Sequence, residues 1–194
     1  MPNAANVTIG APEQSATVGA ILDAPIGTAL PASTSDTLNN SFKSSGFVSE
    51  DGVRLSPSIS TTDIKDWSGS IVRKIIDSFD GTIVWSELEM TYESMCHAFG
   101  ADNVIKTAAN AQHGEQLKVS LGAHLPAARS WVFRMKDGDK RLMIVVPNGQ
   151  VTEVGEMSFM SSEAIKPEIT LSCYDDGTGN SIYIYTDDGL KVSA

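Results

Sequence analysis

Residues 129–146 read RSWVFRMKDGDKRLMIVV, and this stretch decides the fold. Two runs rich in apolar and β-branched residues, Arg129 to Lys136 and Lys140 to Val146, flank the polar residues Asp137–Gly138–Asp139. An Asp-Gly pair between two such runs favours the tight turn of a β-hairpin. The stretch therefore predicts two antiparallel strands joined by a short turn.

The sequence that follows predicts a meander of further strands. Pro147–Asn148–Gly149 has the composition of a turn and leads into a run from Val151 to Phe159. Ile169 to Tyr174 and Ser181 to Thr186 predict a last strand pair around the polar loop Asp175 to Asn180. Because this loop lacks the alternating ligand order and the terminal Glu of an EF-hand, a hairpin connection is the simpler interpretation, and calcium stays an open alternative.

Upstream of the meander, the sequence predicts a second hairpin. Trp67 to Ile76 and Thr82 to Met90 are β-favouring runs, and their connection, Asp77 to Gly81, ends in Asp-Gly. The two-residue period of a pleated strand divides the second run into an apolar face and a mixed face. The apolar face carries Val84, Leu88 and Met90, and the mixed face carries Ile83, Trp85, Glu87 and Glu89.

One segment, Thr91 to Phe99, has the pattern of an α-helix. Thr91 can accept hydrogen bonds from the free amides of the first turn, and Gly100 can take the left-handed conformation that ends a helix. A helix this short is not stable alone in water, so it must pack an apolar stripe on a sheet. That stripe consists of Tyr92, Met95, Cys96 and Phe99.

These elements together predict a mainly β fold. With a further strand from Gln116 to His124, they match a β-sandwich or partly closed barrel with one short flanking α-helix. Residues 1–62 are more polar and carry few large apolar side chains. We therefore expect an extended N-terminal arm at 1–16 and a single domain at 17–194, which begins with a strand from Val18 to Ile26 and includes a long loop at about 36–62.

The charge of the chain argues against several classes of protein. It has 14 basic and 24 acidic residues, for a formal net charge of −10. Proteins that grip DNA neutralise phosphates with clustered Lys and Arg, so a sequence-reading DNA binder is not expected. The longest apolar run, Leu142 to Val146, is far shorter than the roughly 20 residues that cross a bilayer. We expect neither a membrane span nor a signal peptide.

No set of reactive side chains predicts a catalytic or metal site. His97, His113 and His124 lack the i, i+4 spacing of a helical metal site. Cys96 and Cys173 are far apart in the sequence, and we expect two packed thiols rather than a disulfide. The glycines form no dinucleotide or phosphate loop. We therefore expect no enzyme, no cofactor and no resident metal.

Glu87 and Glu89 are the one pair of carboxylates whose spacing suggests a functional role. On a pleated strand they are about 7 Å apart and share a face, a geometry compatible with acid–base chemistry. Charge that faces solvent or the lumen of an assembly is the commoner explanation. An acidic β protein with several sheet edges to cover favours self-assembly, because bare edges pair with other copies.

Several segments resemble the major tail tube proteins of long-tailed, non-contractile bacteriophages. Residues 18–31, VGAILDAPIGTALP, followed by 40–43, NSFK, and 46–52, GFVSEDG, resemble the N-terminal signature of that family. The later order also fits: Lys65–Asp66–Trp67, then a hairpin ending in Glu87–Leu88–Glu89, a short helix ending at Phe99–Gly100, and a strand meander. The resemblance spans about residues 17 to 190.

The resemblance implies a structural role in the virion tail, with assembly in the host cytoplasm. Subunits of this family form stacked hexameric rings that make a hollow conduit for genome ejection. Partners implied are further copies of the chain, the tape measure, tail terminator and distal tail proteins, and double-stranded DNA that passes without specific binding. We expect the lumen to be acidic and Glu87 and Glu89 to face it, because acidic walls repel phosphates.

Two alternatives remain open. Another virion structural protein, such as a head-decoration or tail-terminator subunit, would share the sandwich but form a closed assembly. A carbohydrate-binding β-sandwich module would need exposed aromatic side chains that stack on sugar rings. The candidates for such a platform are Trp67, Trp85, Trp131, Tyr183 and Tyr185.

Overall fold

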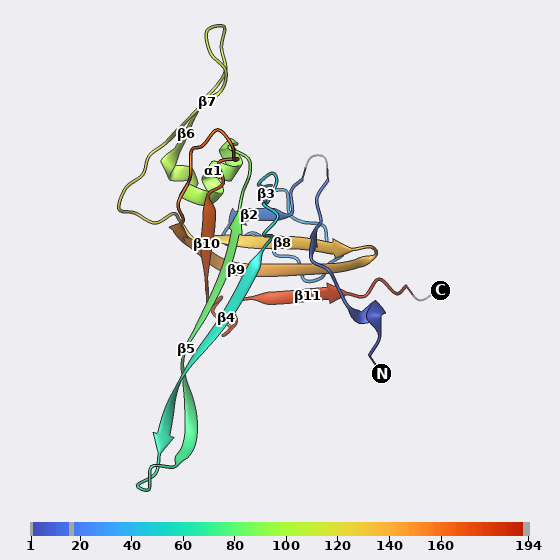
Figure 1. Ribbon diagram of the computed structural model, residues 1–194, viewed down its shortest axis with the longest axis vertical. Helices are drawn as coiled ribbons and strands as arrows, with labels where there is room; N and C mark the ends of the chain where they lie inside the picture. The colour runs from blue at the N-terminus through green and yellow to red at the C-terminus, as the bar shows by residue number, and fades with distance from the viewer. Residues whose placement is uncertain (1, 16–17, 192–194) are drawn as a thin grey trace.

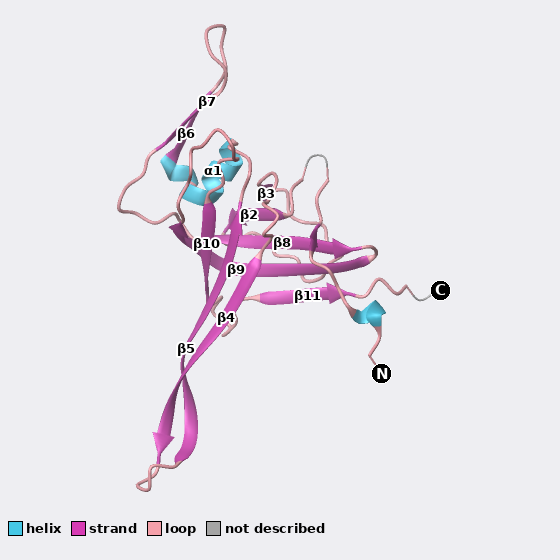
Figure 2. Ribbon diagram, in the orientation of Figure 1, coloured by secondary structure: helices cyan, strands magenta, loops and turns pink. Residues whose placement is uncertain are grey.

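The computed structural model describes residues 2–15 and 18–191, and the fold is mainly β with one short α-helix, as predicted (Figure 2). The strands are β1 (Ala11–Pro12), β2 (Ile21–Pro25), β3 (Lys43–Ser44), β4 (Arg54–Lys65), β5 (Ile71–Ser86), β6 (Val104–Thr107), β7 (Gln116–Val119), β8 (Arg129–Asp137), β9 (Lys140–Val154), β10 (Glu168–Tyr174) and β11 (Tyr183–Asp187). The helices are α1 (Tyr92–Phe99) and two 3-10 turns, η1 (Ala4–Asn6) and η2 (Ala101–Asn103).

Nine strands form one antiparallel sheet in the order β3-β2-β8-β9-β10-β5-β4, with β1 paired to β8 and β11 to β9. β6 and β7 form a separate two-stranded sheet. In Figure 1, β2, β8, β9 and β11 run across the molecule, while β4 and β5 follow its long axis. The sheet therefore changes direction at β9 and β10, as in sandwiches whose layers share a bent strand.

The predicted hairpin at 129–146 is confirmed as β8 and β9, but the predicted turn at Pro147–Asn148–Gly149 is wrong. β9 continues through these residues to Val154, and there it changes partner from β8 to β10. The β8–β9 register shifts at this point, and Pro tolerates such a bulge because it has no N–H to pair. The turn-like composition thus marks a bend within one strand.

The last two strands are also partnered differently from the prediction. β10 lies between β9 and β5, and β11 pairs with the first half of β9, so the two do not pair with each other. The loop between them satisfies its own acids: Asp175 accepts a hydrogen bond from the Gly177 amide, and Asp176 accepts from Thr178. This loop therefore joins two strands that lie one after the other along the same edge of β9, rather than a hairpin pair.

The second predicted hairpin is wrong, because its two expected strands, 67–76 and 82–90, both overlap the single strand β5, and the hairpin in the structure is formed by β4 and β5. β5 runs without a break through Asp77 to Gly81, and the turn lies instead at Asp66 to Ser70. β4, which precedes this turn, occupies the last third of the predicted loop at 36–62. Gly69 has a φ of 87°, which suits a tight turn, whereas Gly81 is not among the described glycines with positive φ. The Asp-Gly pair at 80–81 is therefore strand, and the Ser- and Thr-rich β4 was mistaken for loop.

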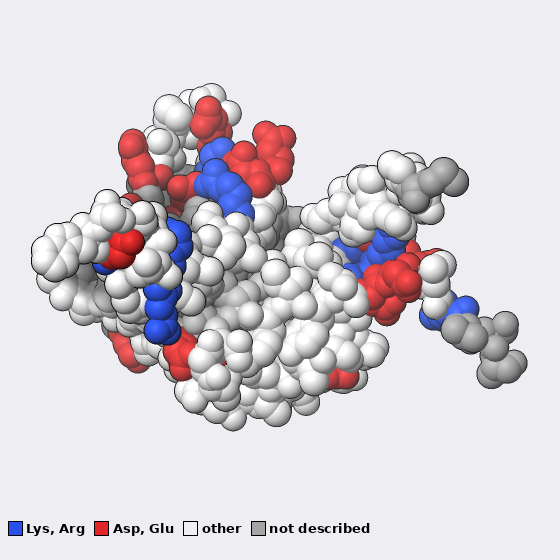
Figure 3. Space-filling view, turned by 90° about the horizontal axis from the view of Figure 1, so that it is seen from below, with Lys and Arg blue, Asp and Glu red and all other residues white. Residues whose placement is uncertain are grey.

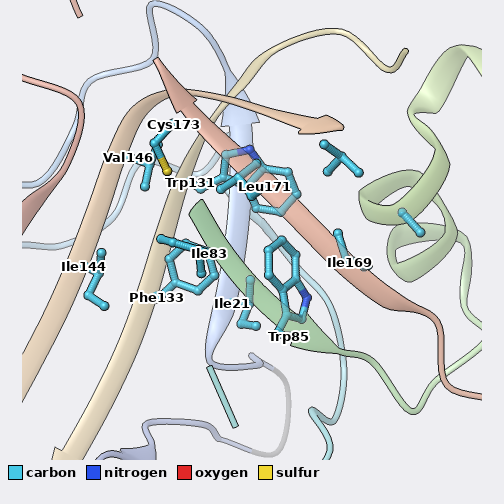
Figure 4. Close-up of a cluster of buried hydrophobic side chains, with 12 residues drawn as sticks. Ile21, Ile83, Trp85, Trp131, Phe133, Ile144, Val146, Ile169, Leu171 and Cys173 are labelled. Carbon is cyan, nitrogen blue, oxygen red and sulfur yellow. The ribbon is translucent and has the colours of Figure 1, made fainter. Parts of the chain in front are cut away.

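The core lies between the crossing layers (Figure 4). Trp85 is the central side chain; its ring lies 5.4 Å from the rings of both Trp131 and Phe133. Ile83 and Trp85, which share the predicted mixed face of β5, are fully buried, and Val84 on the predicted apolar face is not. The face predicted to be apolar is therefore the more exposed one, and the face predicted to be mixed is the core face. The two glutamates made the second face look polar, although it carries the large aromatic ring of Trp85.

The helix is confirmed with both of its caps. The Thr91 side chain accepts a hydrogen bond from the Ser94 amide, and Gly100, with a φ of 83°, donates its N–H to the Cys96 carbonyl. Met95 and Cys96 pack with Val104 of β6, so α1 is clamped between the main sheet and the small one. Both cysteines are free and buried, as expected.

Residues 2–15 of the predicted N-terminal arm are described, and part of this segment pairs with the main sheet. The Ile9 amide donates to Asp137, and β1 pairs with Lys136 and Met135 of β8. Residues 16 and 17, at the expected end of the arm, lie outside the described residues. No helix in residues 2–15 and 18–191 is long and apolar enough to cross a membrane.

Candidate assembly surface

The two carboxylates singled out from the sequence lie in different environments. β5 ends at Ser86, so Glu87 is joined to the sheet only by a single bridge to Val48, and its side chain is fully buried. Glu89 is half-buried, and its Oε1 accepts a hydrogen bond from the Phe47 amide at 3.0 Å. For Glu87 the expected lumen-facing position is corrected, because its face of the chain is the core face. For Glu89 it stays a prediction.

Glu87 belongs to a buried cluster of charges under α1. Its Oε1 accepts hydrogen bonds from the Trp85 indole N–H and from Nδ1 of His97, both at 3.1 Å. Nε2 of His97 lies 3.1 Å from Oδ1 of Asp23 on β2, and Asp23 also pairs with Arg129 of β8. Four elements that are distant in sequence are thus joined by two acids and two bases.

The pKa values of the cluster follow from this pairing. Burial alone would lower the pKa of His97, but the charge of Glu87 and the ion pair with Asp23 raise it to about 10. Burial would raise the pKa of Asp23, and His97 together with Arg129 holds it below its usual range. At neutral pH His97 is therefore a cation, and the cluster is neutral in sum. Such a paired cation ties elements together and is poorly suited to moving a proton.

The other candidate residues do not gather into a reactive site. His113 bonds with Asn110 and with the Gly114 carbonyl, and His124 bonds with Asn103, so the three histidines lie in separate places. Across the described part of the chain, no group of three or more His, Cys, Asp or Glu is arranged to hold a metal ion. Trp85 and Trp131 are buried, so they cannot form a sugar-stacking platform.

The most distinctive feature of the molecule is the β4–β5 hairpin, which projects from the body along the long axis (Figure 1). Near the body, β10 pairs with β5 from Ser86 to Gly81 and covers its edge. Beyond Gly81 the hairpin has only its own two strands, and β4 is the edge of the sheet. Unpaired N–H and C=O groups on such edges are ready to pair with another chain.

One face of this hairpin is apolar and continues the core. Residues paired across antiparallel strands lie on the same face, so Leu55 and Ile83 are followed by Pro57 and Gly81, then Ile59 and Phe79, then Thr61 and Ile76. We call these residues the apolar face of the hairpin. Ile59 is 61% exposed and Ile76 is 68% exposed, although Ile83 at the base of the same face is fully buried.

A β-bulge keeps this face continuous. The register shifts between Ser60 and Thr61, which leaves Asp77 as the extra residue of β5. Ile76 and Phe79 are three residues apart, so in a regular strand they would lie on opposite faces. The bulge brings them to the same face. Asp77 instead points to the polar face, where it accepts a hydrogen bond from Thr62. The bulge therefore extends the apolar face toward the tip.

Seen along the hairpin, charged side chains lie in small groups, and a broad uncharged surface lies between them (Figure 3). Large exposed apolar patches on soluble proteins mark sites of association. The apolar face of the hairpin offers a bare strand edge and exposed aliphatic side chains, and its chemistry suits contact with protein. This surface could not be predicted once the hairpin turn was expected at 77–81, 11 residues after its position at 66–70. The alternation of apolar and hydroxyl side chains across 54–65 was the available signal.

The comparison with protein-family models agrees with a structural role. A family model described as phage tail tube protein matches residues 13–194. Among solved structures, the chain is similar to the tube-terminating cap of the anti-feeding prophage, solved by cryo-electron microscopy, with 13% identity and a TM-score of 0.42 over 96% of this chain and 100% of that one. No curated protein sequence matches it.

Proposed function

Since the chain belongs to the phage tail tube protein family, we propose that it is the repeating subunit of a hollow tail tube, built as stacked rings, most simply of six copies. The observation that carries this proposal is the apolar face of the hairpin, which continues the core beyond the body of the subunit. A second copy that covers this face and pairs with the free edge of β4 would extend the sheet from one subunit to the next.

This mode of contact explains why a ring should close. The hairpin of one copy and the body of the next are different surfaces, so the contact is heterologous, and such contacts give rings when the rotation closes. Stacked rings remain open at both ends and have no intrinsic length. The tube therefore needs partners that set its length and cap it, the roles of the tape measure, tail terminator and distal tail proteins.

The charge of the subunit suits a conduit. A net charge of −10 per copy makes the wall of an assembled tube repel the phosphates of passing DNA. Glu89 is the remaining candidate for a lumen-facing carboxylate, since its side chain keeps some exposure while Glu87 has none. We propose that the genome slides through without specific binding, in the virion tail, and that the subunit has no enzymatic role.

The test is to replace apolar residues of this face by polar ones and to image the assemblies that the variant forms. We expect the double variant Ile59→Ser/Ile76→Ser to abolish tubes in negative-stain images of the concentrated protein, because two exposed aliphatic anchors are lost. Both side chains are more than half exposed, so the melting temperature should stay close to that of the parent chain.

The matched control is Ser60→Ala/Ser78→Ala, a cross-strand pair on the polar face of the same hairpin. Tubes should form as in the parent chain. If the parent chain forms only closed rings or small oligomers at every concentration, the head-decoration or tail-terminator alternative is favoured instead. Equal tube formation by the Ile double variant would contradict the proposed contact.

A further inference from the structure

The tip of the hairpin is a fixed turn that presents one side chain. Oδ1 of Asp66 accepts hydrogen bonds from the Ser68 hydroxyl at 2.7 Å and from the Ser70 amide at 2.8 Å. The Asp66 amide donates to the Ser70 carbonyl, and the Gly69 amide donates to the Asp66 carbonyl. Trp67, which these bonds enclose, is wholly exposed. The turn is ordered by its own bonds, so its tryptophan is held out without support from the body.

A wholly exposed tryptophan on an ordered turn is unusual for a lone subunit. Tryptophan is among the residues most enriched at the energetic centres of protein interfaces, where it fills an apolar pocket of the partner. A turn that is already ordered also loses little conformational entropy when it docks. Trp67 therefore has the properties of an anchor for a partner, since no contact among the described residues covers it.

A pocket of about 260 Å³ lies on the other side of the body, beside α1. Phe99 of α1 and Val154 at the end of β9 form its inner walls, and Leu121, Leu125 and Pro126 form its outer wall. Leu121 and Leu125 are 71% and 57% exposed, so the outer wall presents apolar surface that the subunit itself leaves open. We call this the end pocket.

The charges around the two features are complementary. Lys65 and Arg73 flank the tip, and neither has an ion pair within the described residues. Glu153 lines the end pocket, is exposed, and likewise has no ion pair in the part of the chain that the structure describes. The Asp66 carboxylate accepts hydrogen bonds within the turn, so the basic side chains of Lys65 and Arg73 remain to pair with the acidic residue at the pocket, which favours the contact and orients it.

The position of the two features makes the contact one between copies. The hairpin tip lies at one end of the long axis, and α1, which walls the end pocket, lies beyond the sheet toward the other end (Figure 1). The tip of a chain therefore cannot reach its own pocket. A knob and a pocket at opposite ends of one chain join copies head to tail and repeat without limit.

We propose that Trp67 is the anchor by which the hairpin tip of one copy docks in the end pocket of a second copy, formed by Phe99, Leu121, Leu125 and Val154. The proposal rests on the proposed function, since it concerns how copies are joined along the tube. It adds a residue and a receiving site to an assembly whose lateral contacts involve the apolar face of the hairpin.

The first test measures the critical concentration for assembly by sedimentation. Trp67→Ala should raise it about tenfold or more, because an interface anchor is lost, and Trp67→Phe should recover part of the effect. The melting temperature of the unassembled variant should not change, because the side chain is wholly exposed. The control is Leu190→Ala, which truncates an exposed apolar side chain outside both surfaces and should leave the critical concentration unchanged.

The second test identifies the pocket. Chains with Trp67→Cys are mixed with chains with Leu125→Cys, assembled above the raised critical concentration expected of a chain without Trp67, and oxidised; a disulfide-linked dimer is expected in assembled material only. The native thiols are buried and do not compete. A mixture of Trp67→Cys with Val7→Cys should give no such product, since Val7 is exposed but lies away from the end pocket.

The outcomes separate this proposal from the proposed function. Tubes that form equally well with Trp67→Ala contradict the anchor while leaving the tail tube role intact. A raised critical concentration without the Trp67–Leu125 cross-link contradicts the end pocket as the receiving site. A parent chain that never assembles contradicts the proposed function itself.

Discussion

At the scale of single residues, His97 is the side chain on which the packing of α1 most depends. Replacing it by Gln removes a cation that sits between two buried carboxylates, Glu87 and Asp23. Loss of one member of a buried ion pair leaves uncompensated charge and typically costs about 3–5 kcal/mol. We expect His97→Gln to lower the free energy of unfolding in urea by an amount in that range.

The same residue predicts a pH dependence. The pKa of His97 is raised from 6.5 to about 10 in the folded chain, so the stability it adds is complete below about pH 6.5 and disappears as the pH rises through 10. The free energy of unfolding should therefore fall between pH 7 and pH 10 in the parent chain. The slope should be much smaller in His97→Gln and unchanged in the control His113→Gln, whose ring is bonded near the surface. Equal slopes in all three chains would refute the assignment.

The charged cluster around His97 could not be predicted from residue types and spacing. Cys96 could be assigned to the core from the helical stripe, and the structure confirms it. His97, one position on, could not, because its partners come from β2 and from the end of β5, and nothing in the spacing of Asp23, Glu87 and His97 indicates that they meet. The face that carries Trp85 and Glu87 was predicted incorrectly for the same reason. A buried Glu is expected at the surface unless its partner, here His97, is known.

At the scale of elements, α1 provides the clearest prediction. Thr91→Ala removes the side-chain acceptor for the Ser94 amide, and the loss of such a cap costs about 1 kcal/mol. We expect the urea midpoint to fall accordingly, and Thr91→Ser to restore it because the hydroxyl is retained. If Thr91→Ser is as unstable as Thr91→Ala, the hydroxyl is not the stabilising group.

Elements that depend on neighbouring residues in the sequence could be predicted, and elements that depend on distant strand pairing could not. The helix, its caps and the β8–β9 hairpin depend on residues within a few positions of one another, and all were found. The β4–β5 hairpin was not predicted because its turn, Asp66 to Ser70, and its two register shifts depend on pairing across the strands. Similarly, Pro147 could be identified as a break in regular pairing, but whether the chain turns or changes partner there depends on where β10 lies.

At the scale of the whole molecule, charge and apolar surface act in opposite directions. Each copy carries a net charge of −10, so approaching copies repel one another, while in the proposed assembly the apolar face of the hairpin and Trp67 favour association. Salt screens the repulsion and leaves apolar burial largely unaffected. Salt also weakens the proposed attraction of Lys65 and Arg73 for Glu153 of a second copy, but that attraction involves few charges compared with the whole surface.

We therefore expect the critical concentration for assembly to fall as ionic strength rises from about 20 to about 150 mM, a range over which the Debye length shortens from about 20 Å to about 8 Å. Sedimentation at a series of salt concentrations measures it, and Trp67→Ala should show the same direction of change from a higher starting value. A critical concentration that rises with salt would mean that ion pairs, not the apolar face, dominate the contact. It would then place the driving force at the charged flanks of the tip, and Lys65→Gln/Arg73→Gln would be expected to remove that dependence.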